Sequence, residues 1–203
     1  MILKADRLSD LLGEGRDGAA ADPLVIVPTP DLETLRKQGT ASVDLRLGTW
    51  FLQARQARTA FLKLGDQSET REPVTTSYVP FGGSFILHPQ SFVLAMTLEW
   101  ISLPADLAAY VIGKSSWGRY GLIIATATGV HPGYKGCLTL ELTNVGEIPI
   151  EIKPGVSICQ LFIHRLESAA AEVSISDFGG LRRPTLRPIR PDPFAEKLAH
   201  AYQ

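Results

Sequence analysis

The chain has 203 residues, of which 45% are apolar and 20% charged, the balance of an ordinary globular protein. Its formal net charge of −1 excludes a surface that as a whole holds a polyanion such as DNA, so any phosphate site needs a local cluster of cations. Cys137 and Cys159 lie in apolar runs and favour buried thiols over a disulfide framework. Without a signal-peptide pattern or an apolar run of membrane-spanning length, the sequence predicts a cytoplasmic protein that binds no membrane.

The N-terminal part of the chain predicts short helices around one strand. Residues 3–13 carry leucines at helical spacing and predict a short amphipathic helix that ends near Gly13 and Gly15. Residues 24–27 predict a short strand. A second helix is expected with Thr29 as N-cap and Pro30 in its first turn, ending at Gly39.

The middle of the chain changes to the period of β-strands. Residues 42–48 alternate polar and apolar side chains, and residues 53–77 are polar and irregular, which predicts an excursion from the core. Further β-rich runs follow, with turn signals about every 8–12 residues, at 85–88, 92–98, 107–112, 122–126, 137–143, 148–152 and 156–164. This spacing favours a sandwich or barrel, and the absence of alternating long helices argues against a parallel α/β sheet.

The C-terminal residues differ from the rest in composition. They are rich in glycine, proline and arginine. Four arginines lie close together with no acidic residue among them: Arg182, Arg183, Arg187 and Arg190. This cluster is either a solvated tail or an arm that lays guanidinium groups on a phosphate chain. We expect one domain at 1–168 and an arm at 169–203, with a last short helix capped by Asp192.

Residues 113–122 read Gly-Lys-Ser-Ser-Trp-Gly-Arg-Tyr-Gly-Leu and form the first candidate for a site. A tight turn with free backbone amides, Lys114 and Arg119 can grip phosphate oxygens, although the glycine spacing of a Walker loop is missing. A solvated turn fits these residues equally well.

Glu141 is an acid in the middle of an apolar strand. Strand alternation puts the leucines at 138, 140 and 142 on one face and Glu141 on the other. If the second face lines a closed pocket, burial would raise the pKa of the carboxylate and suit it to proton transfer near neutral pH. A solvent-facing strand glutamate is the alternative.

The histidines do not predict a metal centre. His131 lies in a glycine turn at 129–134, where it is either a proton carrier, a ligand contact or a turn residue. The sequence lacks the zinc deaminase signature, a His-x-Glu followed by Pro-Cys-x-x-Cys. It also lacks a predicted helix with two histidines at i and i+4, so we expect no zinc.

Taken together, these motifs resemble the dCTP deaminase branch of the dUTPase superfamily. The resemblance covers most of the chain and is strongest at 113–122, at Pro-Gly-Tyr-Lys-Gly and at Leu-Glu-Leu-Thr-Asn. In chain order the matching stretches are 42–48, 85–89, 94–98, 103–107, 113–122, 132–136, 140–144, 153–156 and 159–161. Several motifs in the same order make the resemblance specific.

The resemblance implies a mainly β fold, a distorted β-barrel or jelly-roll of the dUTPase-like type with short peripheral helices. It implies a homotrimer with sites between subunits and no nucleic-acid partner. The implied reaction is hydrolysis of dCTP to dUTP and ammonia, with Mg²⁺ carried by the triphosphate and no zinc. By position, Glu141 is the implied general base, while Ser115 and Arg119 orient and polarise the water. The implied substrate-binding residues are Lys114, Ser116, Thr126, His131, Tyr134, Gln160, Phe178, Arg182 and Arg183.

Three positions depart from the family's pattern. His131 stands where family members usually have an acid, which in dUTPases activates the water that cleaves the phosphate chain. This argues against a dUTPase-like pyrophosphohydrolase and against a bifunctional deaminase–diphosphatase. Lys114 replaces the usual arginine and loses its bidentate fork, and Phe178 replaces a tyrosine of the closing arm. A non-catalytic nucleotide-binding homologue is a further alternative.

Overall fold

The computed structural model describes residues 1–18, 20–54, 74–125, 129–169, 179–186, 192–194 and 197–198. In chain order its elements are α1 (Ala5–Arg16), β1 (Val25–Val27), α2 (Leu32–Gln38), β2 (Val43–Arg46), β3 (Trp50–Ala54), β4 (Val74–Tyr78), β5 (Phe85–Leu87), β6 (Phe92–Ser102), β7 (Leu107–Gly113), α3 (Ser115–Gly118), β8 (Leu122–Ile124), β9 (Gly129–Val130), β10 (Lys135–Asn144), β11 (Ile150–Ile152) and β12 (Ser157–Arg165). The mainly β fold with short helices is the one predicted. Within the described residues, no helix is long and apolar enough to cross a membrane.

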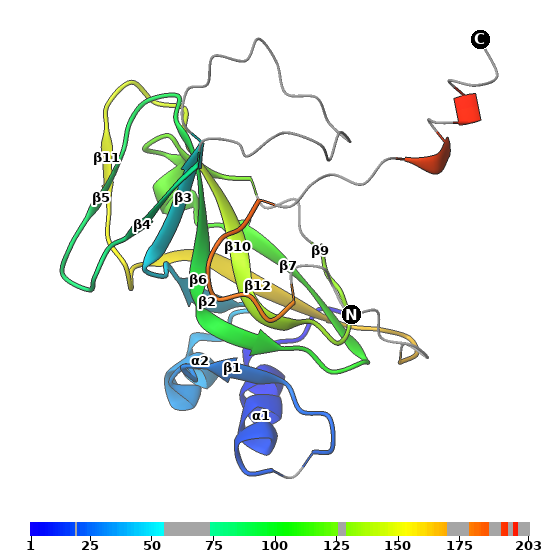
Figure 1. The fold of residues 1–203 in the computed structure, drawn as a ribbon. Coiled ribbons are helices and arrows are strands. Elements are labelled where there is room, and N and C mark those ends of the chain that lie inside the picture. Colours follow the sequence, from blue (N-terminus) through cyan, green and yellow to red (C-terminus); the bar gives the residue numbers. More distant parts are fainter. Residues whose placement is uncertain are drawn as a thin grey trace.

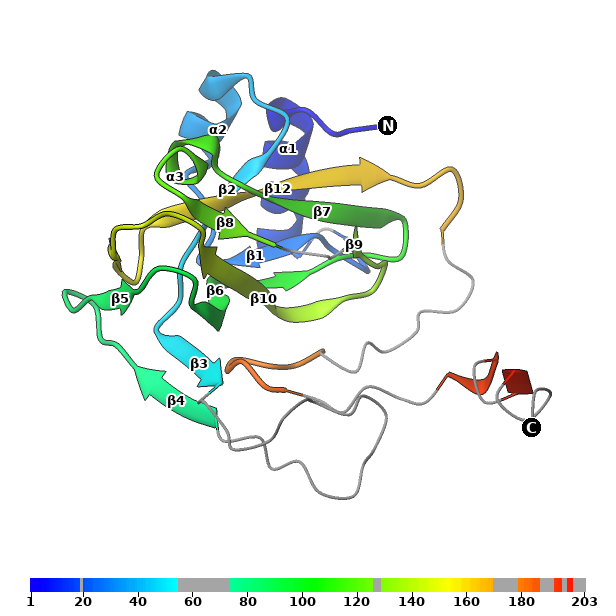
Figure 2. The same cartoon turned by 90° about the horizontal axis from the view of Figure 1, so that it is seen from above.

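The strands form three antiparallel sheets, with α1 and α2 packed together at one end of the molecule (Figures 1 and 2). The largest sheet has the order β4-β3-β6-β10-β8, and β1 also pairs with β6. A second sheet has the order β2-β12-β7-β9, and β5 pairs with β11. An isolated bridge between Leu47 and Thr97 joins the two larger sheets. In the described part of the chain the sheets do not close into one ring of hydrogen bonds, so the distorted barrel is open.

The core lies between the two larger sheets. Leu138, Leu140 and Leu142 of β10 are buried there, while Glu141 on the opposite face is half-buried, as strand alternation predicts. Cys137 does not follow the alternation, because the register of β10 against β6 shifts between Cys137 and Thr139, and Cys137 is only 8% exposed.

Helix α1 includes both glycines and ends at Arg16, one residue past Gly15 and close to the predicted end. Gly15 allows the helix to approach the segment before β1, because a Cβ at this position would lie 2.5 Å from the carbonyl oxygen of Leu24. The glycine therefore serves close packing here rather than termination.

Helix α2 begins later than predicted. Its N-cap is Asp31 rather than Thr29, since the Asp31 carboxylate accepts hydrogen bonds from the backbone amides of Glu33 and Thr34. The predicted end at Gly39 is confirmed, with a positive φ of 62° at that residue.

The predicted excursion from the core at 53–77 is wrong at both of its ends. Residues 53–54 belong to β3 and residues 74–77 to β4, and these two strands pair along their whole length. Residues 55–73 lie outside the described part of the chain. Of the predicted last helix, residues 193–194 and 197–198 are helical, and the Phe194 amide donates to the Asp192 carboxylate.

The two cysteines are free and buried, as predicted from their apolar surroundings. Cys137 lies in β10 of the largest sheet and Cys159 in β12 of the second sheet. Burial raises the pKa of both thiols, that of Cys159 to about 12.

Asn144 closes the end of β10 with a fully buried side chain. Its amide nitrogen donates to the carbonyl oxygens of Leu87 at 3.0 Å and Ile148 at 2.9 Å, and its oxygen accepts from the Gly146 amide at 2.9 Å. One side chain thus ties β10 to β5 and to the loop before β11.

The Asn144→Leu variant should be much less stable than the wild type, because three backbone groups lose their partner in a site that stays closed to water. We expect the free energy of unfolding to fall by roughly 3 kcal/mol, measured by chemical denaturation. The control is Val145→Ala at the exposed neighbouring position. A loss below about 1 kcal/mol in Asn144→Leu would contradict this assignment.

Candidate active site

The turn after β7 presents three of the predicted site residues to solvent. Ser115 and Ser116 open the four-residue helix α3 and Arg119 follows it, and all three are exposed. Trp117 points the other way: it packs against the core, and its indole N–H donates to the carbonyl oxygen of Ser157 at 3.0 Å. The turn is therefore fixed from beneath while its hydroxyls and its cation stay accessible.

Lys114, directly before α3, is already bound within the protein. Its ammonium group lies 2.5 Å from a carboxylate oxygen of Asp44 and 3.1 Å from the hydroxyl of Ser157. The Ser157 hydroxyl and the Gln160 side-chain amide each donate to the Asp44 carboxylate at 3.1 Å. We call these four residues the Lys114 cluster; it brings together two predicted site residues, Lys114 and Gln160.

The Asp44 carboxylate is stabilised in its charged form. Partial burial is the largest single influence and raises its pKa, but hydrogen bonds from Lys114, Gln160 and Ser157 and the charge of Lys114 together outweigh burial. The net result is a pKa below the ordinary value of 3.8. Asp44 therefore faces Lys114 as an anion at neutral pH.

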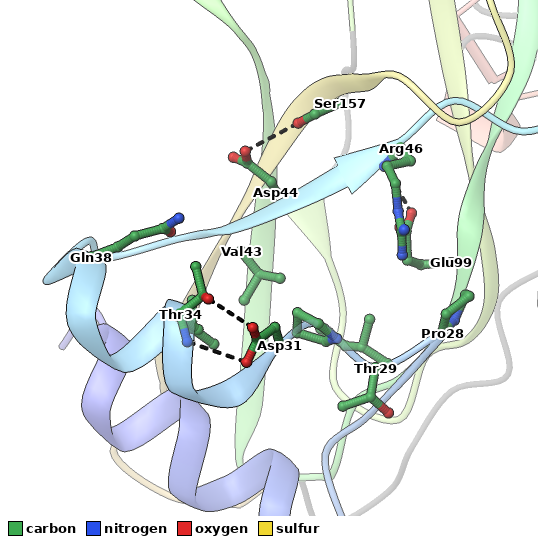
Figure 3. Close-up of a pocket in the computed structure, with 13 residues that line it drawn as sticks. Pro28, Thr29, Asp31, Thr34, Gln38, Val43, Asp44, Arg46, Glu99 and Ser157 are labelled. Carbon is green, nitrogen blue, oxygen red and sulfur yellow. Dashed lines mark hydrogen bonds and ion pairs between the residues drawn. The ribbon is translucent and has the colours of Figure 1, made fainter.

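Asp44 and Ser157 also line a cavity of about 270 Å³ between α2, β2 and β6 (Figure 3). In the same wall, the Glu99 carboxylate accepts from the backbone amide of Arg46 at 2.8 Å and from its side-chain Nε at 2.7 Å. Glu99 is only 2% exposed and the Arg46 side chain is 39% exposed, so this pair joins β2 to β6 through a buried carboxylate.

Glu141 lies in the middle of β10, between β6 and β8. Its neighbour across β6 is the buried Leu94, and its backbone carbonyl accepts from the Ala125 amide at 2.8 Å. In the described part of the chain, its carboxylate forms no hydrogen bond or ion pair, and none links it to Ser115 or Arg119. The half-buried carboxylate is therefore available to a ligand.

The glycine turn places His131 at the surface. The His131 carbonyl accepts from the Tyr134 amide, and its side chain is exposed. The Tyr134 hydroxyl donates to the carbonyl oxygen of Cys137 at 2.7 Å, and burial raises the pKa of Tyr134. This hydroxyl thus stabilises the turn itself. The predicted site residue Thr126 lies outside the described residues.

Residues 179–186 of the arm lie against the largest sheet (Figures 1 and 2). The Gly180 amide donates to the Lys135 carbonyl at 2.7 Å, and the Leu181 carbonyl accepts from the Cys137 amide at 3.1 Å. Both contacts are to the first residues of β10, so the arm runs beside the strand that carries Glu141.

Two predicted arginines of the arm lie over tryptophans of the sheet. The guanidinium carbon of Arg182 is 5.1 Å from the ring centre of Trp100, and that of Arg183 is 4.0 Å from the ring centre of Trp50. Such cation–π contacts hold the described arm on the sheet. Phe178, the other predicted arm residue, lies outside the described part of the chain.

Sequence reasoning missed four residues around these groups: Asp44, Ser157, Trp50 and Trp100. The alternating pattern of its strand marks Asp44 as a polar residue, but it does not predict the contact with Lys114, which is 70 residues away along the chain. The tryptophans carry no spacing signal that relates them to arginines of the arm.

The Lys114→Met variant should raise the pKa of Asp44, because burial persists while the hydrogen bond and the charge of Lys114 disappear. In the wild type the lowered pKa means that ionised Asp44 stabilises the fold above pH 3.8, and this contribution is lost as the pH falls through the lowered pKa. In Lys114→Met the loss should occur at higher pH. A carbon-13 NMR titration of the Asp44 carboxyl measures this, with Lys37→Met as control; an unchanged pKa would contradict the pairing.

Comparison with known proteins agrees with these observations. The family model described as dCTP deaminase-like matches residues 12–166. The dCTP deaminase of Halorubrum lacusprofundi is 42% identical over 171 residues, which are 84% of this chain and 80% of that protein. A protein of Methanobrevibacter smithii named dCTP deaminase, dUMP-forming, is 35% identical over 170 residues, 83% of this chain and 82% of that protein.

Among solved structures, the 2′-deoxycytidine 5′-triphosphate deaminase from Agrobacterium tumefaciens has the same fold, with a TM-score of 0.56 at 22% identity. The match covers 80% of this chain but only 47% of that one, so this chain spans about half of its length. This likeness confirms the predicted fold class, and the sequence matches identify the family. The chain belongs to the dCTP deaminase-like family.

Proposed function

We propose that the protein converts dCTP to dUTP and ammonia, with Glu141 as the general base. The observation that carries the proposal is the half-buried carboxylate of Glu141, which in the described part of the chain has no partner. A carboxylate held on a strand beside an apolar neighbour, yet open to a ligand, suits repeated proton transfer. Family membership supplies the substrate class.

In the proposed reaction the carboxylate takes a proton from water as the water oxygen attacks C4 of the cytosine. The two protons of the water end on N3 of the ring and on the leaving amino group, and the water oxygen becomes the new carbonyl oxygen of uracil. Ammonia leaves as the C4–N bond breaks. The attack uses Glu141 and water, and Glu141 returns to its ionised form at the end of the cycle.

Ser115 and Arg119 are proposed to orient the water and to stabilise the charge that develops during the attack. Both residues are exposed, Ser115 on α3 and Arg119 directly after it, which supports this role because fixed donors must remain free for the reacting atoms. We further propose that the protein is a homotrimer in which neighbouring subunits complete each site. In the described part of the chain no hydrogen bond or ion pair links Ser115 or Arg119 to the Glu141 carboxylate, which is compatible with such shared sites.

The triphosphate is proposed to contact Ser116, Arg182 and Arg183, with the arm at 169–203 closing over the site formed by residues 1–168. Magnesium enters as part of the substrate, bound to the triphosphate. The described residues include no group of three or more His, Cys, Asp or Glu side chains that could hold a metal ion. Lys114 can contribute only the part of its ammonium group that the Lys114 cluster leaves free.

We propose that dUTP is the end product and is not cleaved further. The exposed side chain at the tip of the glycine turn is His131, so this position supplies no carboxylate for water attack on the phosphate chain. The Methanobrevibacter smithii relative is named dUMP-forming, so an assay has to distinguish dUTP from dUMP as the product.

Incubation of the pure protein with dCTP and magnesium should therefore yield dUTP and ammonia in equal amounts, resolved by chromatography. The Glu141→Gln variant should lose roughly 10²–10⁴-fold or more in kcat, because it cannot accept the proton. Glu151→Gln, which removes an exposed strand carboxylate elsewhere, is the matched control.

Three outcomes would overturn parts of the proposal. Tight nucleotide binding without turnover would indicate a non-catalytic homologue. Pyrophosphate and dUMP as products would refute dUTP as the end product. An undiminished rate in Glu141→Gln would refute the assigned base. The same assay with dCMP and modified cytosine nucleotides defines the substrate.

A further inference from the structure

Helix α3 depends on other parts of the fold for its position. A helix of four residues is far shorter than the length at which a helix becomes stable by itself, so tertiary contacts must hold it. On the described chain α3 packs against β8, and two hydrogen bonds tie its first turn to β12. The Lys114 amide donates to the Ile158 carbonyl at 3.1 Å, and the Trp117 indole donates to the Ser157 carbonyl at 3.0 Å.

The Lys114 cluster adds a charged anchor at the start of α3. Lys114 follows β7, whereas Asp44 comes from β2 and Ser157 and Gln160 come from β12. In the sheet order β2-β12-β7 one strand, β12, lies between β2 and β7, so the ammonium group reaches over β12 to its carboxylate. Figure 3 shows the Asp44 and Ser157 side chains directed toward each other in this region.

We infer that Asp44 is a positioning residue, which holds Lys114 and thereby fixes α3 with Ser115 and Arg119 in reacting geometry. This inference rests on the proposed function and assigns Lys114 a different main role from phosphate binding. An ammonium group has three donors, and Asp44 and Ser157 occupy two of them. One donor remains for a ligand, so a phosphate can approach while the anchor persists.

The two roles of Lys114 predict opposite effects of removing Asp44. If Lys114 mainly bound phosphate, Asp44 would compete with the substrate, and its removal would strengthen substrate binding. If Asp44 positions α3, its removal loosens the turn, and the rate falls while binding changes little. Side chains of Asp44 and Lys114 are 48% and 27% exposed, so the pair contributes little to global stability and its effect stays local.

The variants Asp44→Asn and Lys114→Met, and the double variant, distinguish these roles. We expect each single variant to lower kcat for dCTP by about 10–100-fold, because a displacement near 1 Å at reacting groups costs that much, with KM changed less than about 3-fold. The double variant should be no worse than either single variant, since both remove one anchor.

Asp106→Asn is the matched control, because it breaks an ion pair with Arg165 at a carboxylate that is similarly exposed, 42% against 48%. It lies at the opposite end of β7 from α3, so kcat should equal that of the wild type. Ser157→Ala removes one hydroxyl of the Lys114 cluster and should lower kcat by a smaller factor than Asp44→Asn. It replaces Asp44→Asn as the test variant if Asp44→Asn fails to fold.

Hydrogen exchange of the segment 113–122, measured by mass spectrometry, tests the anchor without activity. Exchange should become at least about 10-fold faster in Asp44→Asn and Lys114→Met but not in the control. Unchanged exchange, or a lower KM with full kcat in Asp44→Asn, would overturn the inference. If the wild type shows no turnover at all, the proposed function fails, while exchange still decides whether Asp44 holds α3.

Discussion

Burial of the leucine face of β10 is the constraint on which the rest of the arrangement depends. Because side chains alternate along a strand, the buried Leu138, Leu140 and Leu142 fix the direction of Glu141. A register slip of one residue would bury the carboxylate and expose three leucines, which makes any other register costly. Pairing of β10 with β6 and β8 on its two sides then holds the chemical group at a fixed place in a sheet.

The second support is the ion pair of the buried Glu99 with the partly exposed Arg46. A carboxylate that is 2% exposed is tolerated only because both of its oxygens are hydrogen-bonded, one to the Arg46 amide and one to its side chain. This pair fixes the short strand β2 against β6. Asp44 lies two residues earlier on β2, so the same pair sets the place from which Asp44 reaches Lys114. Packing of the core, the ion pair of Glu99 with Arg46 and the ion pair of Asp44 with Lys114 thus connect the core with α3.

The sequence predicts those features that depend on neighbours along the chain. The alternation around Glu141, the stop at Gly39 and the two buried thiols are local, and all are confirmed. Thr29 was the wrong cap because Asp31 satisfies the same local rule two residues later and is the one that reaches the amides. Pairing of β3 with β4 and of Asp44 with Lys114 depends on residues brought together only by the fold. Assignment of Ser115, Arg119 and Glu141 to one reaction stays a prediction.

The two thiols lie under different parts of the fold, so their reactivity reports on two different opening events. Since only the thiolate reacts, and burial keeps both groups protonated, Cys137 and Cys159 should be silent toward alkylating reagents in the folded protein. One thiol belongs to the sheet that carries Glu141, the other to the sheet that anchors α3. Cys159 belongs to the buried core, so its modification marks the exposure of that core, whereas Cys137 lines a cavity with Arg182, so its modification marks the displacement of residues 179–186 from the sheet.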